Sequence, residues 1–228
     1  MAGMALRRWA ATFANGTVLA TMESLNARHP WSHNDHFHSW ILANLPERRQ
    51  SALDVGCGRG ELLASLAPHF ASVHGADADA TMREEAARRC SGLANVAVES
   101  VDWTASPGAP FDLVTMIAVL HHLDVTKALR EVRGLLAPGG KFLAVGLATP
   151  RNLRDHAWDL ASAVTNPVIG YVKHPWPSPA GKQPPPFPVQ DPAQSFDELR
   201  GLVDDVMPGA EMRHRLGFRH TIAWTKPE

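Results

Sequence analysis

The glycine-rich segment of this chain reads Leu53-Asp54-Val55-Gly56-Cys57-Gly58-Arg59-Gly60-Glu61-Leu62-Leu63. Three glycines at alternate positions allow a tight turn after an apolar strand, and they leave bare backbone beside a ligand. Leu66 and Ala67 extend the apolar pattern at helical spacing. The segment therefore predicts a strand, a turn and the positive end of a helix, which together suit a nucleotide-like cofactor.

The residue after the third glycine narrows the choice of cofactor. The dinucleotide fingerprint has its third glycine three residues after its second, whereas this sequence has Glu61 there and a glycine one residue early, at Gly60. A carboxylate at the helix start would repel a pyrophosphate. S-adenosylmethionine carries a sulfonium and an amino acid tail but no phosphate, so it fits this loop better. We predict it as the cofactor, with S-adenosylhomocysteine as the product.

An acidic residue follows the next expected strand, residues 71–76. Asp77 is the first residue after that apolar run, about twenty residues past the loop, where a ribose is held by its hydroxyls. We predict that Asp77 binds the ribose and that Asp79 caps a helix over 81–89.

Strands and helices alternate along the middle of the chain. Further strands are expected at 96–99, 111–117 and 141–147, and a helix over 125–136 is expected to stop at Pro138-Gly139-Gly140. The strand over 111–117 is almost continuously apolar, as a strand covered on both faces should be. This alternation predicts a parallel sheet with helices on both faces.

The run from Leu53 to Leu147 resembles the class I S-adenosylmethionine-dependent methyltransferases. The matching segments, in order, are Asp54 to Gly60, Gly75-Ala76-Asp77, Val101-Asp102-Trp103, Phe111-Asp112-Leu113-Val114 with His121-His122-Leu123, and Leu135-Leu136-Ala137-Pro138-Gly139-Gly140. The resemblance implies an α/β fold of the Rossmann-like methyltransferase type: a three-layer α-β-α sandwich around a mostly parallel seven-stranded sheet with an antiparallel last strand. It also implies an enzyme that transfers a methyl group.

The same resemblance implies the residues that contact the cofactor. Those on the methionine and ribose side are Asp54, Gly56, Cys57, Gly58, Gly60, Asp77 and Ile117. Asp54 would organise the loop and bind the amino group directly or through water, or would have a structural role only. On the adenine side, Ala78 and Met82 would lie along the ring, and Asp102 would bind its amino group with Trp103 alongside.

Four histidines and two tryptophans lie within residues 29–40. We expect this segment to fold over the cofactor, with His33 and His38 binding it and His36 acting on the acceptor. The alternative is a solvated helix whose aromatic residues are buried. No metal is expected, because no cysteine or acidic cluster accompanies the histidines.

Two adjacent histidines, His121 and His122, follow the strand over 111–117. Imidazole titrates near neutrality, so either one is a candidate base for the acceptor's proton. The alternative is a turn without a catalytic role, because methyl transfer needs little beyond alignment of the reacting atoms.

Composition limits the partners. The net charge of −1 over 228 residues gives no basic footprint for a nucleic acid, and no apolar stretch approaches the length of a membrane span. Two cysteines suggest no disulfide framework. We expect a cytoplasmic monomer or homodimer that methylates oxygen, nitrogen or carbon of a small-molecule acceptor. The alternatives are a non-catalytic S-adenosylmethionine-binding regulatory protein and a dinucleotide-dependent oxidoreductase.

We expect one domain in four segments. Residues 1–45 form a helical segment on the substrate side, 46–149 the Rossmann-like core, 150–192 an acceptor-side insertion, and 193–228 the final helix and hairpin. The insertion should contain a helix over 153–164, with Leu153, Ala157, Leu160, Ala161 and Val164 on its apolar face, and then a proline-rich loop over 174–192. A capped helix should run from Ser195 to about Met207, followed by strands over 211–216 and 220–225.

Overall fold

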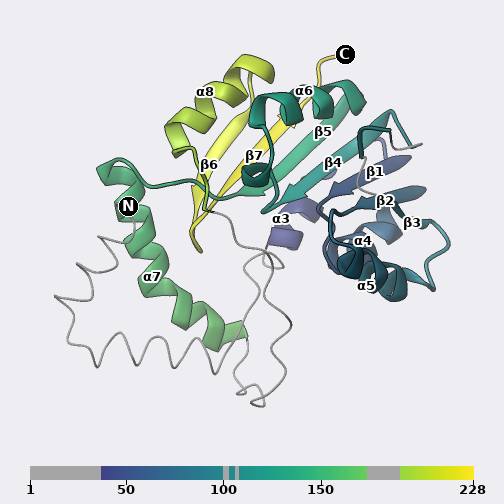
Figure 1. Ribbon diagram of the computed structural model, residues 1–228, viewed down its shortest axis with the longest axis horizontal. Helices are drawn as coiled ribbons and strands as arrows, with labels where there is room; N and C mark the ends of the chain where they lie inside the picture. Colours follow the sequence, from purple (N-terminus) through teal and green to yellow (C-terminus); the bar gives the residue numbers. More distant parts are fainter. Residues whose placement is uncertain (1–36, 100–102, 106–107, 174–190) are drawn as a thin grey trace.

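The computed structural model describes residues 37–99, 103–105, 108–173 and 191–228 (Figure 1). Within them, seven strands form one sheet in the order β3-β2-β1-β4-β5-β7-β6. The strands are β1 Ser51–Val55, β2 Ser72–Ala76, β3 Val96–Glu99, β4 Phe111–Ile117, β5 Leu136–Gly146, β6 Glu211–Arg215 and β7 Arg219–Thr225. Strand β7 runs antiparallel to both of its neighbours, and the other pairs are parallel. The predicted sheet is confirmed.

Helices cover both faces of this sheet (Figure 1). They are α3 His38–Ala43, α4 Glu61–Leu66, α5 Ala80–Cys90, α6 Val125–Leu135, α7 Leu153–Lys173 and α8 Phe196–Val206. Two hydrophobic clusters fill the layers, one against α6 and α8 and the other against α3, α4 and α5. Neighbouring residues of β4 enter different clusters, Val114 the first and Leu113 the second, because successive strand side chains point to opposite faces. The molecule is therefore the expected three-layer sandwich.

Strand β5 begins five residues earlier than the sequence predicts. Helix α6 leads directly into β5 at Leu136, so Pro138-Gly139-Gly140 lies within the strand and not before it. The early part pairs irregularly: the register with β4 shifts near Phe111, and Gly139 has φ +73°. Its amide donates to the carbonyl of Lys226 at 2.9 Å. The prediction failed because a Pro-Gly-Gly run can continue a strand when an irregular backbone still finds partners.

Helix α7 differs from its prediction in length and in the face it buries. It continues to Lys173, and its predicted apolar face points outward, with Leu153 89% and Leu160 65% exposed. The buried side carries Asp155 and Ser162, which are 6% and 1% exposed. The reason is tertiary: the Ser162 hydroxyl accepts a hydrogen bond from the amide of Phe218 at 3.2 Å, in the turn between β6 and β7.

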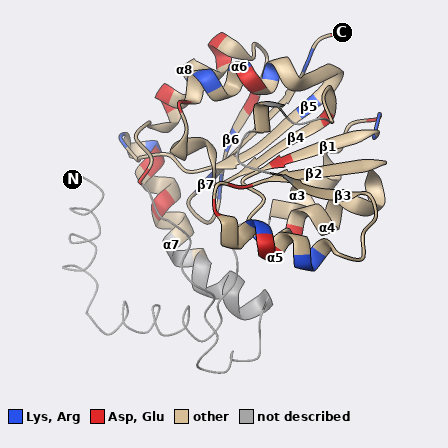
Figure 2. Cartoon of the chain, turned by 45° about the vertical axis from the view of Figure 1, so that its right-hand side comes forward, with Lys and Arg blue, Asp and Glu red and all other residues tan. Residues whose placement is uncertain are grey.

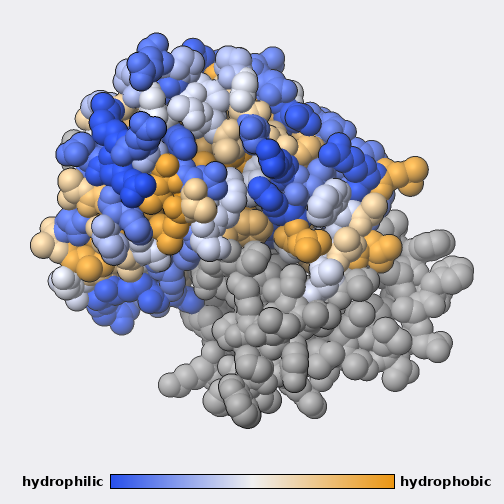
Figure 3. Space-filling model, turned by 180° about the vertical axis from the view of Figure 1, so that it is seen from behind, coloured by the Kyte–Doolittle hydropathy of each residue, from blue (hydrophilic) through white to orange (hydrophobic). Residues whose placement is uncertain are grey.

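In the view of Figure 2, the described Lys and Arg residues are interspersed with Asp and Glu over the helices. Figure 3, which shows the molecule from behind Figure 1, shows hydrophilic and apolar patches mixed over the described residues. Among the described helices, none is both long and apolar enough to cross a membrane.

Candidate active site

The glycine loop lies at the carboxyl end of β1 and is tied to the end of β2. The amides of Gly56 and Cys57 both donate to the carbonyl of Ala76, at 2.7 and 3.1 Å. Three glycines of the loop, Gly56, Gly58 and Gly60, have φ of +72°, +52° and +79°. Side chains rarely adopt this backbone region, so the loop conformation requires glycine.

Two of these glycines also lie against neighbouring elements. A Cβ on Gly56 would lie 2.0 Å from Cγ2 of Val119, in the turn after β4. A Cβ on Gly60 would lie 3.0 Å from Cα of Ala86 in α5. The absence of side chains therefore allows the loop to pack tightly between the end of β4 and helix α5.

Asp77, at the end of β2, faces the glycine loop. Its Oδ2 accepts a hydrogen bond from the amide of Gly58 at 2.9 Å, and its Oδ1 accepts one from the amide of Asp79 at 2.9 Å. Asp79 caps α5 as predicted, because its carboxylate accepts hydrogen bonds from the amides of Thr81 and Met82. The side chain of Asp77 is thus fixed beside the loop, whereas its contact with a ribose stays a prediction.

Asp54 is a buried carboxyl group at the end of β1, where it is 3% exposed. Burial raises the pKa of Asp54 to about 7, while a hydrogen bond from the Thr115 hydroxyl, at 2.7 Å, opposes that rise. The charge of Asp77 raises the same pKa further. An ammonium group nearby would favour the ionised form of Asp54. This carboxyl group therefore fits a cofactor that carries an amino group.

The arginines near the start of α4 are held by carboxylates. Arg89 pairs with Glu61 at 2.5 Å, and Arg59 pairs with Glu85 at 2.8 Å. These pairs hold the loop and α4 against α5, and they offset the positive charge that a pyrophosphate would need. The paired charges around the start of α4 therefore fit a cofactor without phosphate, in agreement with the prediction from Glu61.

The other predicted cofactor residues lie in varied surroundings. Cys57 is buried, and burial raises the pKa of its thiol, so the side chain stays protonated. Met82 is a buried residue of α5, Ala78 is exposed, and Ile117 is half-buried at the end of β4. Trp103 is buried in the cluster that packs against α6. His38 is the first residue of α3 and is half-buried, while His33, His36 and Asp102 lie outside the described residues.

His121 and His122 form a short 3-10 turn, Leu120–His122, after β4. Their rings lie 4.0 Å apart, and His122 is exposed. The pKa of His121 is lowered to about 4, first by burial and then by the charges of His122 and Arg219. His121 is therefore neutral near pH 7, and its buried Nδ1 has no hydrogen-bond partner within the described structure.

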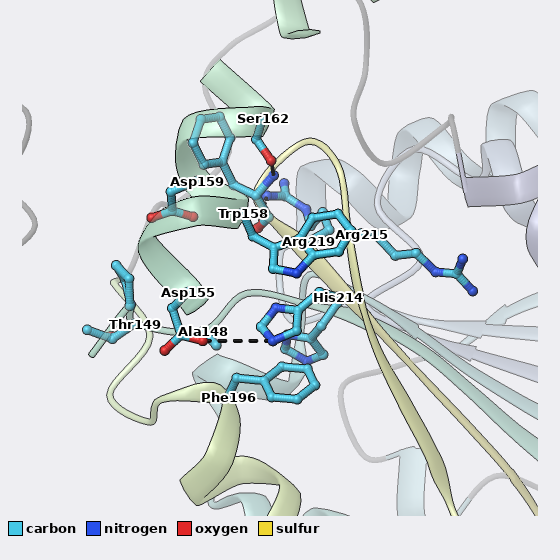
Figure 4. A pocket seen from close by; sticks show the side chains of 13 residues that line it. Ala148, Thr149, Asp155, Trp158, Asp159, Ser162, Phe196, His214, Arg215 and Arg219 are labelled. Carbon is cyan, nitrogen blue, oxygen red and sulfur yellow. Dashed lines mark hydrogen bonds and ion pairs between the residues drawn. The ribbon is translucent and has the colours of Figure 1, made fainter. Parts of the chain in front are cut away.

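A small cavity of about 30 Å³ lies beyond the carboxyl end of β5 (Figure 4). Its lining residues are Ala148, Thr149, Pro150, Asp155, Trp158, Asp159, Ser162, Phe196, His214, Arg215, Phe218, Arg219 and His220. The hairpin reaches this edge because β7 is antiparallel: its second residue, His220, pairs with Gly146 at the end of β5. The sequence predicted the segment 150–192 as the acceptor side but missed the hairpin residues. The expected antiparallel last strand could have placed these hairpin residues at this edge of the sheet.

The fold is of the Rossmann-like type, and the surroundings of its glycine loop suit a nucleoside cofactor without phosphate. Residues 53–142 match the family model of a methyltransferase domain. An uncharacterised methyltransferase of Mycobacterium tuberculosis is 36% identical over 201 residues, which cover 87% of this chain and 98% of that protein. Trans-aconitate 2-methyltransferase of Methylobacterium radiotolerans is 39% identical over 128 residues, covering 54% of this chain and 47% of that protein.

Solved structures show the same fold. A protein of Pyrococcus horikoshii has a TM-score of 0.58 at 18% identity and covers 90% of this chain and 93% of that chain. Geranyl diphosphate C-methyltransferase of Streptomyces coelicolor, solved with S-adenosylhomocysteine, has a TM-score of 0.57 at 13% identity, covering 84% of this chain and 77% of that chain. The chain belongs to the class I S-adenosylmethionine-dependent methyltransferases, and S-adenosylmethionine is its cofactor.

Proposed function

We propose that this methyltransferase acts on a small-molecule acceptor that binds in the cavity of Figure 4. The position of the cavity carries the proposal. Val119 packs on Gly56 of the cofactor loop, and His121 follows Val119 in the same turn. Arg219, whose charge lowers the pKa of His121, lines the cavity. The turn after β4 therefore packs on the cofactor loop, and the charge of a cavity residue acts on that turn.

Charge and the similar proteins favour the same class of acceptor. The net charge of −1 does not favour a nucleic acid. Trans-aconitate 2-methyltransferase and geranyl diphosphate methyltransferase, both similar to this chain, are named for small acceptors. For this chain we propose only the class, a small molecule.

We propose that the residues of the loop hold the cofactor as the sequence predicted. Gly56, Cys57, Gly58 and Gly60 would face its methionine part, with Ile117 closing that side. Asp54 would pair with its amino group, and Asp77 would accept from its ribose hydroxyls. Ala78 and Met82 would lie along the adenine, beside Asp102 and Trp103. The buried carboxyl of Asp54 and the fixed carboxylate of Asp77 support these two roles.

Alignment of the acceptor atom with the methyl carbon and the sulfur would provide most of the rate enhancement. When bound, S-adenosylmethionine supplies a methyl group on a positively charged sulfur. An acceptor hydroxyl or amine that gains this methyl group loses a proton, which water or a neutral histidine such as His121 would accept. With a pKa of about 4, His121 is a weak base near pH 7. His122 and His36 are the other candidates, and a dedicated base is not required.

Calorimetry followed by a transfer assay tests the proposal. We expect the purified protein to bind S-adenosylmethionine and S-adenosylhomocysteine but not NADH. With a methyl-labelled cofactor, we expect label to enter at least one member of a panel of small alcohols, phenols, amines and acids. Binding without turnover on any panel member would instead support the non-catalytic regulator, and binding of NADH alone would support the oxidoreductase. Gel filtration would check for the expected monomer or homodimer.

A further inference from the structure

The carboxylate of Asp77 uses only part of its capacity to accept hydrogen bonds from the described residues. An ionised carboxylate offers about four lone-pair sites on its two oxygens. The amide of Gly58 donates to Oδ2 and the amide of Asp79 donates to Oδ1, each at 2.9 Å. Each oxygen can therefore accept one further hydrogen bond, which matches the two hydroxyls of a ribose. Whether the carboxylate meets those hydroxyls depends on how firmly its orientation is held.

Arg83, near the start of α5, contacts the backbone on either side of this carboxylate. Its Nη1 donates to the carbonyl of Asp77 at 2.7 Å and to the carbonyl of Ala78 at 3.0 Å. Side chains of a helix lean toward its N-terminus, so the guanidinium reaches back over the turn that leads into α5. Arg83 is half-buried there, and its own amide donates to the carbonyl of Asp79 at 3.1 Å. One side chain thus holds two successive peptide groups between β2 and α5.

One of these peptide groups also contacts the carboxylate of Asp77. The carbonyl of Ala78 and the amide of Asp79 belong to one planar peptide unit. Its carbonyl accepts from Arg83, and its N–H donates to Oδ1 of Asp77. Because the unit is rigid, a fixed carbonyl also fixes the direction of the N–H. Donation to the carbonyl polarises the same unit and strengthens the bond from its N–H to the carboxylate.

We propose that Arg83 is a positioning residue that fixes the carboxylate of Asp77 for the ribose hydroxyls of the cofactor. This inference rests on the proposed function, since it takes Asp77 as the residue that accepts from the ribose. Arg83 acts through the peptide unit between Ala78 and Asp79 and does not itself contact the cofactor. Loss of its guanidinium therefore weakens cofactor binding through the ribose hydroxyls alone.

Two ligands separate the ribose contact from the rest of the cofactor: S-adenosylhomocysteine and its analogue with a dideoxyribose, which lacks both hydroxyls. Calorimetry on the full-length protein measures both dissociation constants. We expect the wild type to bind S-adenosylhomocysteine about tenfold more tightly than the analogue, the scale of one hydrogen bond to a charged group.

The decisive variant is Arg83→Met, which keeps a long unbranched side chain but donates no hydrogen bond. We expect it to bind S-adenosylhomocysteine about fivefold more weakly than the wild type, the scale of one hydrogen bond. The analogue should bind as it does to the wild type, so the preference for the ribose hydroxyls shrinks. Arg83→Ala, which introduces the strongest helix former, serves if Arg83→Met does not fold.

Two further variants control for charge and for the helix. Arg83→Lys keeps a positively charged donor, and we expect it to recover most of the lost affinity for S-adenosylhomocysteine. Arg88→Met removes an exposed arginine from the same helix and should leave both dissociation constants unchanged. Thermal unfolding of each variant before titration shows that folded proteins are compared.

The outcomes separate the role of Arg83 from the proposed function. If S-adenosylhomocysteine does not bind the wild type, the proposed function fails. If the wild type binds both ligands equally, Asp77 does not hold the ribose and Arg83 has nothing to position. If the wild type prefers S-adenosylhomocysteine but Arg83→Met keeps that preference, or loses affinity for both ligands equally, Arg83 has a structural role only. Arg83→Lys that binds as weakly as Arg83→Met would also overturn the proposal.

Discussion

The carboxylate of Asp77 accepts a hydrogen bond from the backbone amide of Gly58 at 2.9 Å, and so joins the end of β2 to the middle of the glycine loop. The second oxygen of the same carboxylate accepts from the amide of Asp79. One side chain thus fixes both the loop and the turn that leads into α5, next to the expected ribose.

Replacement of Asp77 by alanine should weaken cofactor binding. The loop amide loses its acceptor, and the ribose hydroxyls lose theirs, at a cost of about 1–3 kcal/mol. Calorimetric titration with S-adenosylhomocysteine measures the loss. Asp79→Ala is the matched control: it removes the cap of α5 and lowers the free energy of unfolding by about 1 kcal/mol, but it should leave the affinity unchanged. Wild-type affinity in Asp77→Ala would show that Asp77 does not contact the cofactor.

The contact between Gly56 and Val119 predicts a measurable coupling. Gly56→Ala places a Cβ 2.0 Å from Val119 Cγ2 and also forces alanine to φ +72°. Only the first cost depends on Val119, because the backbone strain, about 1–2 kcal/mol, remains whatever the neighbour is. Urea unfolding of Gly56→Ala, Val119→Ala and the double variant should therefore show partial rescue. If the changes in unfolding free energy of the two single variants simply add in the double variant, Val119 does not pack against Gly56.

Local signals predicted the core of the fold well. Strands β3 and β4 begin and end at the predicted residues, and β4 is a continuous apolar run because both of its faces are covered. The cap of α5 by Asp79 and the capped start of α8 at Ser195 are also confirmed, the latter as a capping box with Glu198. These features depend on neighbours within a few positions in the sequence.

The proposed acceptor side could not be predicted in the same way. Which face of α7 is buried depends on the hairpin, because Ser162 and Asp155 meet Phe218 and His214 more than fifty residues further along the chain. The apolar pattern of α7 favoured the opposite face. The cavity is likewise assembled from segments between Ala148 and His220. Only the tertiary structure brings them together.

The raised pKa of Asp54 predicts that this residue destabilises the protein as the pH rises. Because the folded pKa is about 7 and the ordinary value is 3.8, the folded state binds the proton more tightly. The contribution to stability is complete below about pH 4 and is lost as the pH rises through 7. Asp54→Asn should therefore gain about 2 kcal/mol relative to wild type between pH 5 and 7. Urea unfolding at both pH values measures this, with Asp204→Asn as an unaffected control.

Burial of His220 changes stability with pH in the opposite direction to Asp54, and so partly hides the effect of Asp54. Its pKa is lowered to about 3, first by burial and then by the charges of His214, Arg219 and His121. The unfolded chain therefore binds the proton more tightly, so stability is complete above about pH 6.5 and is lost as the pH falls toward 3.

Replacement of His220 by leucine should expose the effect of Asp54. Leucine keeps the side chain apolar and removes an Nε2 that has no hydrogen-bond partner within the described structure. Relative to wild type, His220→Leu should gain about 2 kcal/mol on going from pH 7 to pH 5. Its own stability should then rise less between pH 5 and pH 7 than that of the wild type, because only His121 and His214, whose pKa values are also lowered, still oppose Asp54. An unfolding free energy that changes with pH as in wild type would mean that folding does not lower the pKa of His220.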